Sequence, residues 1–144
     1  MILVAGTSGI IAAFDGNAPE GPSCRRLLQE AGTVVLSPLV LAEVDHLARA
    51  RLSAVARSRI LELLTAEVQR MRFQVPDIGP ETLATALGVI GRYADLDLDL
   101  ADAVTVTLAA DYRTDAVLTL DRRDFRAVRP LTSHKAFRLF PDDL

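Results

Sequence analysis

Two kinds of apolar pattern alternate along this chain. Short runs of consecutive apolar residues are typical of buried strands, whereas longer segments repeat apolar residues every three or four positions, as an amphipathic helix does. The short runs predict strands at residues 2–5, 33–36, 73–75, 116–120 and 137–140. The longer segments predict helices at residues 10–14, 23–31, 38–47, 53–70, 80–93 and 100–112. The last strand precedes Pro141, so we expect it at an edge of the sheet.

Residues at the boundaries support these helices. Ser23 and Ser37 are suitable N-caps, and Pro38 suits the first turn of the helix that follows Ser37. Short strands that alternate with amphipathic helices imply a parallel sheet covered on both faces. The sequence therefore predicts the α/β class, with residues 1–144 as a single domain.

Composition excludes several classes of protein. Of the 144 residues, 50% are hydrophobic and 24% are charged, which excludes a disordered chain. The longest uncharged stretches are shorter than the ~20 residues that cross a bilayer, and the first apolar run lacks a basic leader. We therefore expect an intracellular, cytoplasmic protein without a membrane segment. The net charge of −3 argues against a protein that coats nucleic acid indiscriminately.

The charged residues are segregated along the sequence. Six arginines lie between residues 49 and 72, and eight aspartates lie between residues 95 and 124. One cysteine and two histidines are too few for a thiolate or imidazole metal site, so carboxylates would hold any metal ion. Carboxylate oxygens favour Mg²⁺ or Mn²⁺. The alternative for each charged block is a solvated surface.

Several polar positions lie next to the predicted strand ends or helix starts. They are Gly6-Thr7-Ser8, Glu43, Asp99 to Asp102, and Asp121. In a parallel sheet such positions meet beyond the carboxyl ends of the strands. Acidic groups gathered there need a cation between them, and a divalent ion supports phosphodiester hydrolysis. The structural alternative for Asp99 is an N-cap, with Asp102 favoured by the helix dipole.

Four segments resemble, in order, the motifs of a known family. They are residues 1–15, 37–44, 100–103 and 119–125, with the sequences MILVAGTSGIIAAFD, SPLVLAEV, LADA and TLDRRDF. They are similar to the successive motifs of PIN-domain ribonucleases, in particular the VapC-type toxins of bacterial toxin–antitoxin (VapBC) systems. The resemblance implies a PIN-like three-layer α/β/α fold with a central, mainly parallel sheet. It also implies an Mg²⁺- or Mn²⁺-dependent endoribonuclease that cleaves structured RNA such as tRNA or rRNA.

The resemblance further implies a homodimer, a VapB-type antitoxin that covers the active site, and a set of acidic site residues. Glu43, Asp102 and Asp121 match three of the family's acidic metal and catalytic positions. Asp124 is a second candidate in the last motif, so the choice between Asp121 and Asp124 stays open. Asp95 and Asp99 are candidates for positions around the metal site that do not contact the metal directly.

At the end of the first strand the sequence departs from the family pattern. The family has Asp-Thr-Ser there, whereas Gly6 precedes Thr7 and Ser8 in this chain. Thr7 or Ser8 matches a hydroxyl that assists near the metal, but glycine offers no ligand, so the first metal-binding carboxylate is missing. We therefore expect an inactivated or weakened nuclease. The alternative is a non-catalytic PIN-like module that binds RNA or titrates an antitoxin.

Basic residues downstream of Glu43 are candidates for RNA binding. They are Arg49, Arg51, Arg57 and Arg59. Positioned beside the acidic site, they would hold RNA phosphates; the alternatives are an exposed helix surface or contact with an acidic partner. Arg122 and Arg123 have the same alternatives, with a local ion pair equally open. His46 is expected to be a surface or dimer-contact residue.

Overall fold

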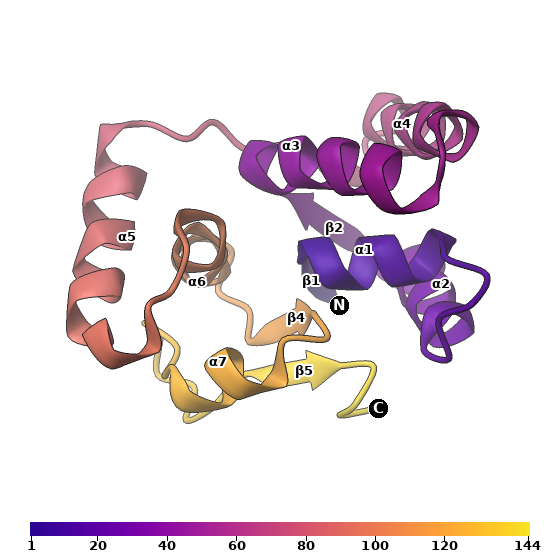
Figure 1. The fold of residues 1–144 in the computed structure, drawn as a ribbon. Coiled ribbons are helices and arrows are strands. Elements are labelled where there is room, and N and C mark those ends of the chain that lie inside the picture. Colours follow the sequence, from indigo (N-terminus) through magenta and orange to yellow (C-terminus); the bar gives the residue numbers. More distant parts are fainter.

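The computed structural model describes residues 1–144 and shows an α/β fold (Figure 1). The strands are β1 (Ile2–Ala5), β2 (Thr33–Leu36), β3 (Phe73–Gln74), β4 (Ala116–Leu118) and β5 (Arg138–Phe140). The α-helices are α1 (Thr7–Phe14), α2 (Gly21–Glu30), α3 (Pro38–Leu47), α4 (Ala54–Gln69), α5 (Pro80–Arg92), α6 (Leu100–Asp111) and α7 (Arg122–Ala127). Two short turns are the π-helical η1 (Ala48–Leu52) and the 3₁₀ turn η2 (Ala94–Leu96). None of these helices combines the length and the apolar character that crossing a bilayer requires.

All five strands form one sheet in the order β3-β2-β1-β4-β5, and every pairing is parallel. The predicted α/β class and parallel sheet are confirmed, and β5 lies at an edge as expected. From β1 the chain first builds β2 and β3 on one side, and then places β4 and β5 on the other. In open parallel sheets, ligands bind beyond the carboxyl ends of the strands at such a reversal. The reversal lies between β1 and β4.

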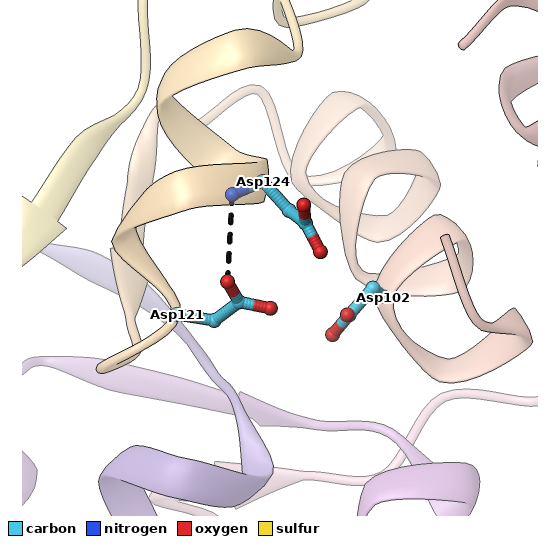
Figure 2. Close-up of side chains that lie close together, drawn as sticks. All are labelled: Asp102, Asp121 and Asp124. Carbon is cyan, nitrogen blue, oxygen red and sulfur yellow. Dashed lines mark hydrogen bonds between the residues drawn. The ribbon is translucent and has the colours of Figure 1, made fainter. Parts of the chain in front are cut away.

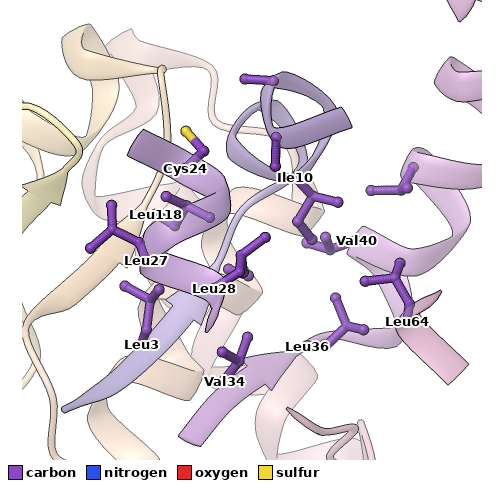
Figure 3. Close-up of a cluster of buried hydrophobic side chains, with 14 of the residues drawn as sticks. Leu3, Ile10, Cys24, Leu27, Leu28, Val34, Leu36, Val40, Leu64 and Leu118 are labelled. Carbon is purple, nitrogen blue, oxygen red and sulfur yellow. The ribbon is translucent and has the colours of Figure 1, made fainter. Parts of the chain in front are cut away.

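Alternate residues of the central strands pack into two separate hydrophobic cores. Leu3 and Ala5 of β1 belong to the core that α1, α2, α3 and α4 cover (Figure 3). Val4 of the same strand faces the opposite side and belongs to the core formed with α5, α6 and α7. There the rings of Phe125 and Phe137 pack edge to face, with centroids 6.0 Å apart. The sheet is therefore the middle of three layers, as the resemblance implies.

Two helix starts differ from the sequence-based expectation. Helix α1 begins at Thr7, three residues before the predicted start. Helix α2 begins at Gly21, so Ser23 lies inside the helix and is not its cap. The earlier start is possible because proline is tolerated in the first turn, and Pro22 occupies that position. Gly21 also packs closely on α1, since a Cβ there would lie 2.8 Å from the carbonyl oxygen of Ala12.

The segment after β4 also differs from the prediction. Strand β4 ends at Leu118, two residues early, and the chain then turns into helix α7, which the sequence pattern did not predict. This helix is only six residues long, too short to show helical periodicity. Asp121 is its N-cap and accepts a hydrogen bond from the backbone N–H of Asp124. The end of β4 therefore delivers two aspartates to the edge of the sheet.

Candidate active site

A pocket of about 330 Å³ lies beyond the carboxyl ends of β1 and β4. The start of α1, the side of α3, the loop after β4 and the start of α6 form its walls. Its acidic lining residues are Asp15, Glu43, Asp99, Asp102 and Asp121. Arg51 is the one cationic side chain that lines it. The acidic residues expected at this edge of the sheet are therefore brought to one pocket.

Asp102, Asp121 and Asp124 form the tightest acidic group (Figure 2). One carboxylate oxygen from each residue lies within 4.8 Å of those of the other two, and all three residues are partly buried. Figure 2 shows Asp102 of α6 facing Asp121, the N-cap of α7, and Asp124 of α7. Because Asp121 and Asp124 both belong to the group, the geometry does not select one of them over the other.

Helix starts hold these carboxylates in place. The side chain of Asp99 is the N-cap of α6 and accepts a hydrogen bond from the backbone N–H of Asp102 at 2.8 Å. The structural role considered for Asp99 is therefore present, although its side chain also lines the pocket. Asp102 and Asp124 both occupy the first turn of a helix, where the helix dipole favours negative charge.

Burial and repulsion raise the pKa of the Asp102 carboxyl to about 7. Desolvation is the largest cause, because a charged carboxylate loses hydration inside the protein. The negative charges of the neighbouring carboxylates add to the rise, in the order Asp99, Asp121, Glu43 and Asp124. No ion pair within 4.0 Å relieves Asp102. The site thus holds more negative charge than the side chains around it neutralise.

The same two effects act on neighbouring carboxyls. Burial raises the pKa of Glu43, and the charge of Asp99 raises it further, while a hydrogen bond from Thr7 opposes both. Burial is also the first cause of the raised pKa of Asp124, followed by repulsion from Asp121. A bound cation would relieve all of these repulsions at once.

Two hydroxyls position the acidic residues. Thr7 Oγ1 donates a hydrogen bond to Glu43 Oε1 at 3.3 Å. Ser8 Oγ accepts one from the backbone N–H of Leu120 at 2.8 Å and lies 3.3 Å from Thr119 Oγ1. Thr7 therefore orients Glu43, whereas Ser8 holds the loop after β4.

Thr119 is a positioning residue that sequence reasoning missed. Its Oγ1 accepts a hydrogen bond from the backbone N–H of Asp121 at 3.0 Å, and its side chain is buried. Together with Ser8, Thr119 fixes the direction in which Asp121 leaves β4. Its place two residues before Asp121 at the end of a predicted strand was the available signal.

Gly6, directly after β1, lines the same pocket as the acidic residues. Its backbone is extended, with φ −93° and ψ 162°, so any residue type could adopt this conformation. Space is the constraint, because a Cβ would lie 2.8 Å from the carbonyl oxygen of Leu118, the atom to which the Gly6 N–H donates at 2.8 Å. The ends of β1 and β4 are therefore so close at this point that a side chain at residue 6 requires the backbone to shift.

The donor set fits a hard divalent cation. Asp102, Asp121 and Asp124 provide carboxylate oxygens only, which is the ligand type that Mg²⁺ and Mn²⁺ prefer. The three carboxylates converge although Gly6 contributes nothing. Glu43 lies outside this group but lines the same pocket. Asp95 is exposed in η2 and does not line the pocket.

The arginines proposed to bind RNA have different surroundings. Arg57 Nε lies 2.5 Å from Asp45 Oδ1, and Arg59 lies 3.9 Å from Glu62. Arg49 and Arg51 are exposed and form no ion pair within 4.0 Å.

The other basic candidates lie beside the site in sequence but have separate surroundings. Arg122 pairs with Asp142 and, at 3.7 Å, with Glu20, so the ion-pair alternative applies to it. The charge of Arg123 lowers the pKa of Asp124 against the larger raising effects. His46 is exposed on α3, as expected of a surface residue.

Known proteins match most of this chain in sequence and in fold. The sequence model of the PIN domain matches residues 4–130. Ribonuclease VapC26 of Mycobacterium tuberculosis is 32% identical over 130 residues, which cover 90% of this chain and 93% of the relative. The crystal structure of M. tuberculosis VapC20, described as a sarcin-ricin loop cleaving toxin, has a TM-score of 0.73 at 18% identity and covers 87% of this chain and 93% of its own. A toxin–antitoxin complex from Klebsiella pneumoniae has a TM-score of 0.67 at 18% identity, with 92% and 98% covered.

Proposed function

Because this chain belongs to the PIN-domain family and to its VapC-type ribonuclease toxins, we propose that it is an endoribonuclease that depends on Mg²⁺ or Mn²⁺. The observation that carries the proposal is the convergence of Asp102, Asp121 and Asp124 within 4.8 Å beside a pocket at the reversal point of the sheet. A purely structural role does not explain carboxylates this close together, because their charges repel one another.

Each side chain has a distinct task in this mechanism. Asp102, Asp121 and Asp124 would hold the cation, which would supply the positive charge that neutralises charge developing on the scissile phosphate. Glu43, oriented by Thr7, faces the same pocket and takes a proton from the attacking water. The raised pKa of Glu43 makes its carboxylate a better proton acceptor than an exposed one.

We propose that Gly6 weakens this activity. The affinity of a site for a hard cation depends on its number of anionic ligands, and this site has one carboxylate fewer than the family pattern provides. The three remaining carboxylates retain enough charge to attract the ion. We therefore expect measurable metal binding together with slow cleavage.

The substrate and the partners are proposed from the relatives. VapC20 is described as cleaving the sarcin-ricin loop, which supports structured RNA, such as tRNA or an rRNA loop, as the substrate class here. The K. pneumoniae structure is a toxin–antitoxin complex, which supports a VapB-type antitoxin as the partner. The homodimer, the single-domain organisation and the cytoplasmic location remain predictions.

RNA cleavage with purified protein tests the proposal. We expect slow cleavage of structured RNA in Mg²⁺, none after chelation, none by Asp102→Asn, and faster cleavage by Gly6→Asp. Asp77→Asn is the matched control, because Asp77 is exposed in the loop between β3 and α5 and lies outside the pocket. Cleavage that survives both chelation and Asp102→Asn would contradict the proposed site.

The departure at Gly6 favours a second candidate function. A PIN-like module without catalysis would still bind RNA or an antitoxin. It predicts that Gly6→Asp leaves RNA cleavage at background while the chain still binds RNA. Comparing metal affinity in the chain and in Gly6→Asp separates the cases, because only a site completed by residue 6 gains affinity from the added carboxylate.

A further inference from the structure

We propose that Arg51 binds an RNA phosphate adjacent to the phosphate that lies at Asp102, Asp121 and Asp124. Among the arginines between residues 49 and 72, Arg51 is the one that contacts the substrate at the active site. The inference rests on the proposed ribonuclease function and adds a specific substrate contact to it. Three independent features of Arg51 support it: its place in the pocket, the turn that carries it, and its lack of a partner.

The first feature is position. Glu43, Leu47 and Arg51 follow one another at intervals of four residues, and all three line the pocket. A spacing of four drifts steadily around a helix with 3.6 residues per turn, so a regular α-helix would carry Arg51 away from the side of Glu43. The π-helical turn η1 reduces this drift, because a π-helix has more residues per turn and so rotates less about its axis with each residue. The π-helical turn therefore keeps the Arg51 side chain at the pocket.

The second feature is that the helix start after η1 is sharply defined. Ser53 is extended and caps α4, with its Oγ accepting a hydrogen bond from the backbone N–H of Ala56 at 2.9 Å. Its own N–H donates to the carbonyl oxygen of Ala48 at 3.1 Å and closes the turn. The segment that presents Arg51 is thus held at both ends by hydrogen bonds, while the side chain itself remains exposed.

The third feature is availability. Arg57 is held by Asp45, and Arg59 lies beside Glu62. Arg51 has no carboxylate within 4.0 Å, although it lines a pocket with five of them. Its guanidinium therefore keeps all its donors free for an incoming anion.

The pocket suits a chain that carries regularly spaced anions. A divalent cation at the carboxylates attracts one phosphate, and Arg51 on another part of the lining is placed for a neighbouring phosphate of the same strand. The planar guanidinium donates two parallel hydrogen bonds to phosphate oxygens, which lysine cannot do. Single-stranded RNA carries one negative charge per nucleotide, so a strand with one phosphate at the cation brings further phosphates to the same pocket.

Binding of a short single-stranded RNA tests the role of Arg51. Fluorescence anisotropy would be measured in Ca²⁺, which keeps the divalent charge, at several salt concentrations. We expect Arg51→Ala to weaken binding about tenfold and to reduce the slope of log affinity against log salt by about 0.7, the value for one lost phosphate contact. Arg51→Lys, which keeps the charge but loses the paired hydrogen bonds, is expected to weaken binding about threefold.

Controls separate this inference from the proposed function. Arg26→Ala removes the same charge from the exposed surface of α2, outside the pocket and outside the RNA-binding candidates, and should change RNA affinity by less than about twofold. Mg²⁺ affinity, measured by calorimetry, should not decrease in Arg51→Ala and should be lost in Asp102→Asn. If Asp102→Asn keeps the wild-type Mg²⁺ affinity, the proposed metal site is wrong.

The role of Arg51 is overturned separately. This happens if Arg51→Ala binds RNA with wild-type affinity and salt slope, or if the wild-type chain binds Mg²⁺ but no RNA. Loss of antitoxin binding by Arg51→Ala with RNA affinity intact would assign the residue to a protein partner and would also overturn the proposal.

Discussion

Replacing Asp102 by asparagine is expected to stabilise the metal-free protein while it abolishes metal binding. The rise of the Asp102 pKa from its ordinary 3.8 to about 7 corresponds to about 4 kcal/mol of unfavourable charge in the folded state. Asp102 is only partly buried, so solvent screening reduces this to about 2 kcal/mol. Asparagine has nearly the same shape and carries no charge, so the variant escapes this cost.

The sign of the pH dependence follows from the raised pKa. Near pH 8 the carboxyl is ionised in both states, and the folded state bears the full cost. As the pH falls below about 7, the folded state takes up a proton first, and the cost disappears below 3.8. The wild-type protein should therefore regain stability on acidification, and the advantage of Asp102→Asn should fall below about 1 kcal/mol near pH 4.

Urea unfolding with a chelator present measures this advantage. The chain has no tryptophan, so circular dichroism is the suitable signal. Asp77→Asn is the control and should change the free energy of unfolding by less than about 0.5 kcal/mol. Mg²⁺ at about a hundredfold excess over its dissociation constant should stabilise the wild type by about 2.7 kcal/mol and the variant by much less. The reasoning is refuted if Asp102→Asn is no more stable than the wild type near pH 8, or if its advantage is independent of pH.

Substitutions at Gly6 and Ser8 test the surroundings of the site, and one at Arg72 tests the end of α2. Gly6→Asp should raise Mg²⁺ affinity but lower the free energy of unfolding by about 1–3 kcal/mol, because its Cβ crowds the carbonyl oxygen of Leu118; Gly6→Ala should show the same loss in urea unfolding without the gain in calorimetry. Ser8→Ala removes the acceptor for the Leu120 N–H and should cost about 1–2 kcal/mol and reduce Mg²⁺ affinity, whereas an unchanged affinity would show that this hydrogen bond does not position Asp121. Arg72→Met should cost about 2 kcal/mol in thermal unfolding, because the guanidinium donates to three backbone carbonyls at the end of α2; a change below about 0.5 kcal/mol would contradict this.

Local sequence patterns predicted the elements that have a long or regular pattern. The strand at residues 2–5 and the helix that Ser37 caps were predicted with their observed bounds, because apolar periodicity and capping depend on residues a few positions apart. The pattern failed at α7, which is too short to show a period, and at the start of α2, where packing against α1 determines which residue begins the helix. The first failure follows from the length of the helix, and the second lies where α2 packs against α1.

By itself, the sequence determined the α/β class, the order of the acidic motifs and the absence of a carboxylate at Gly6. These follow from residue type and short-range spacing alone. Only the tertiary structure decided that Asp121 and Asp124 both face Asp102, that Ser8 holds a loop, and that Arg51 is unpaired while Arg57 is not. Contacts of this kind join segments that lie far apart along the chain, and the order of strands in the sheet brings them together. Their energies depend on interatomic distance and burial, and neither can be obtained from the spacing of residues along the chain.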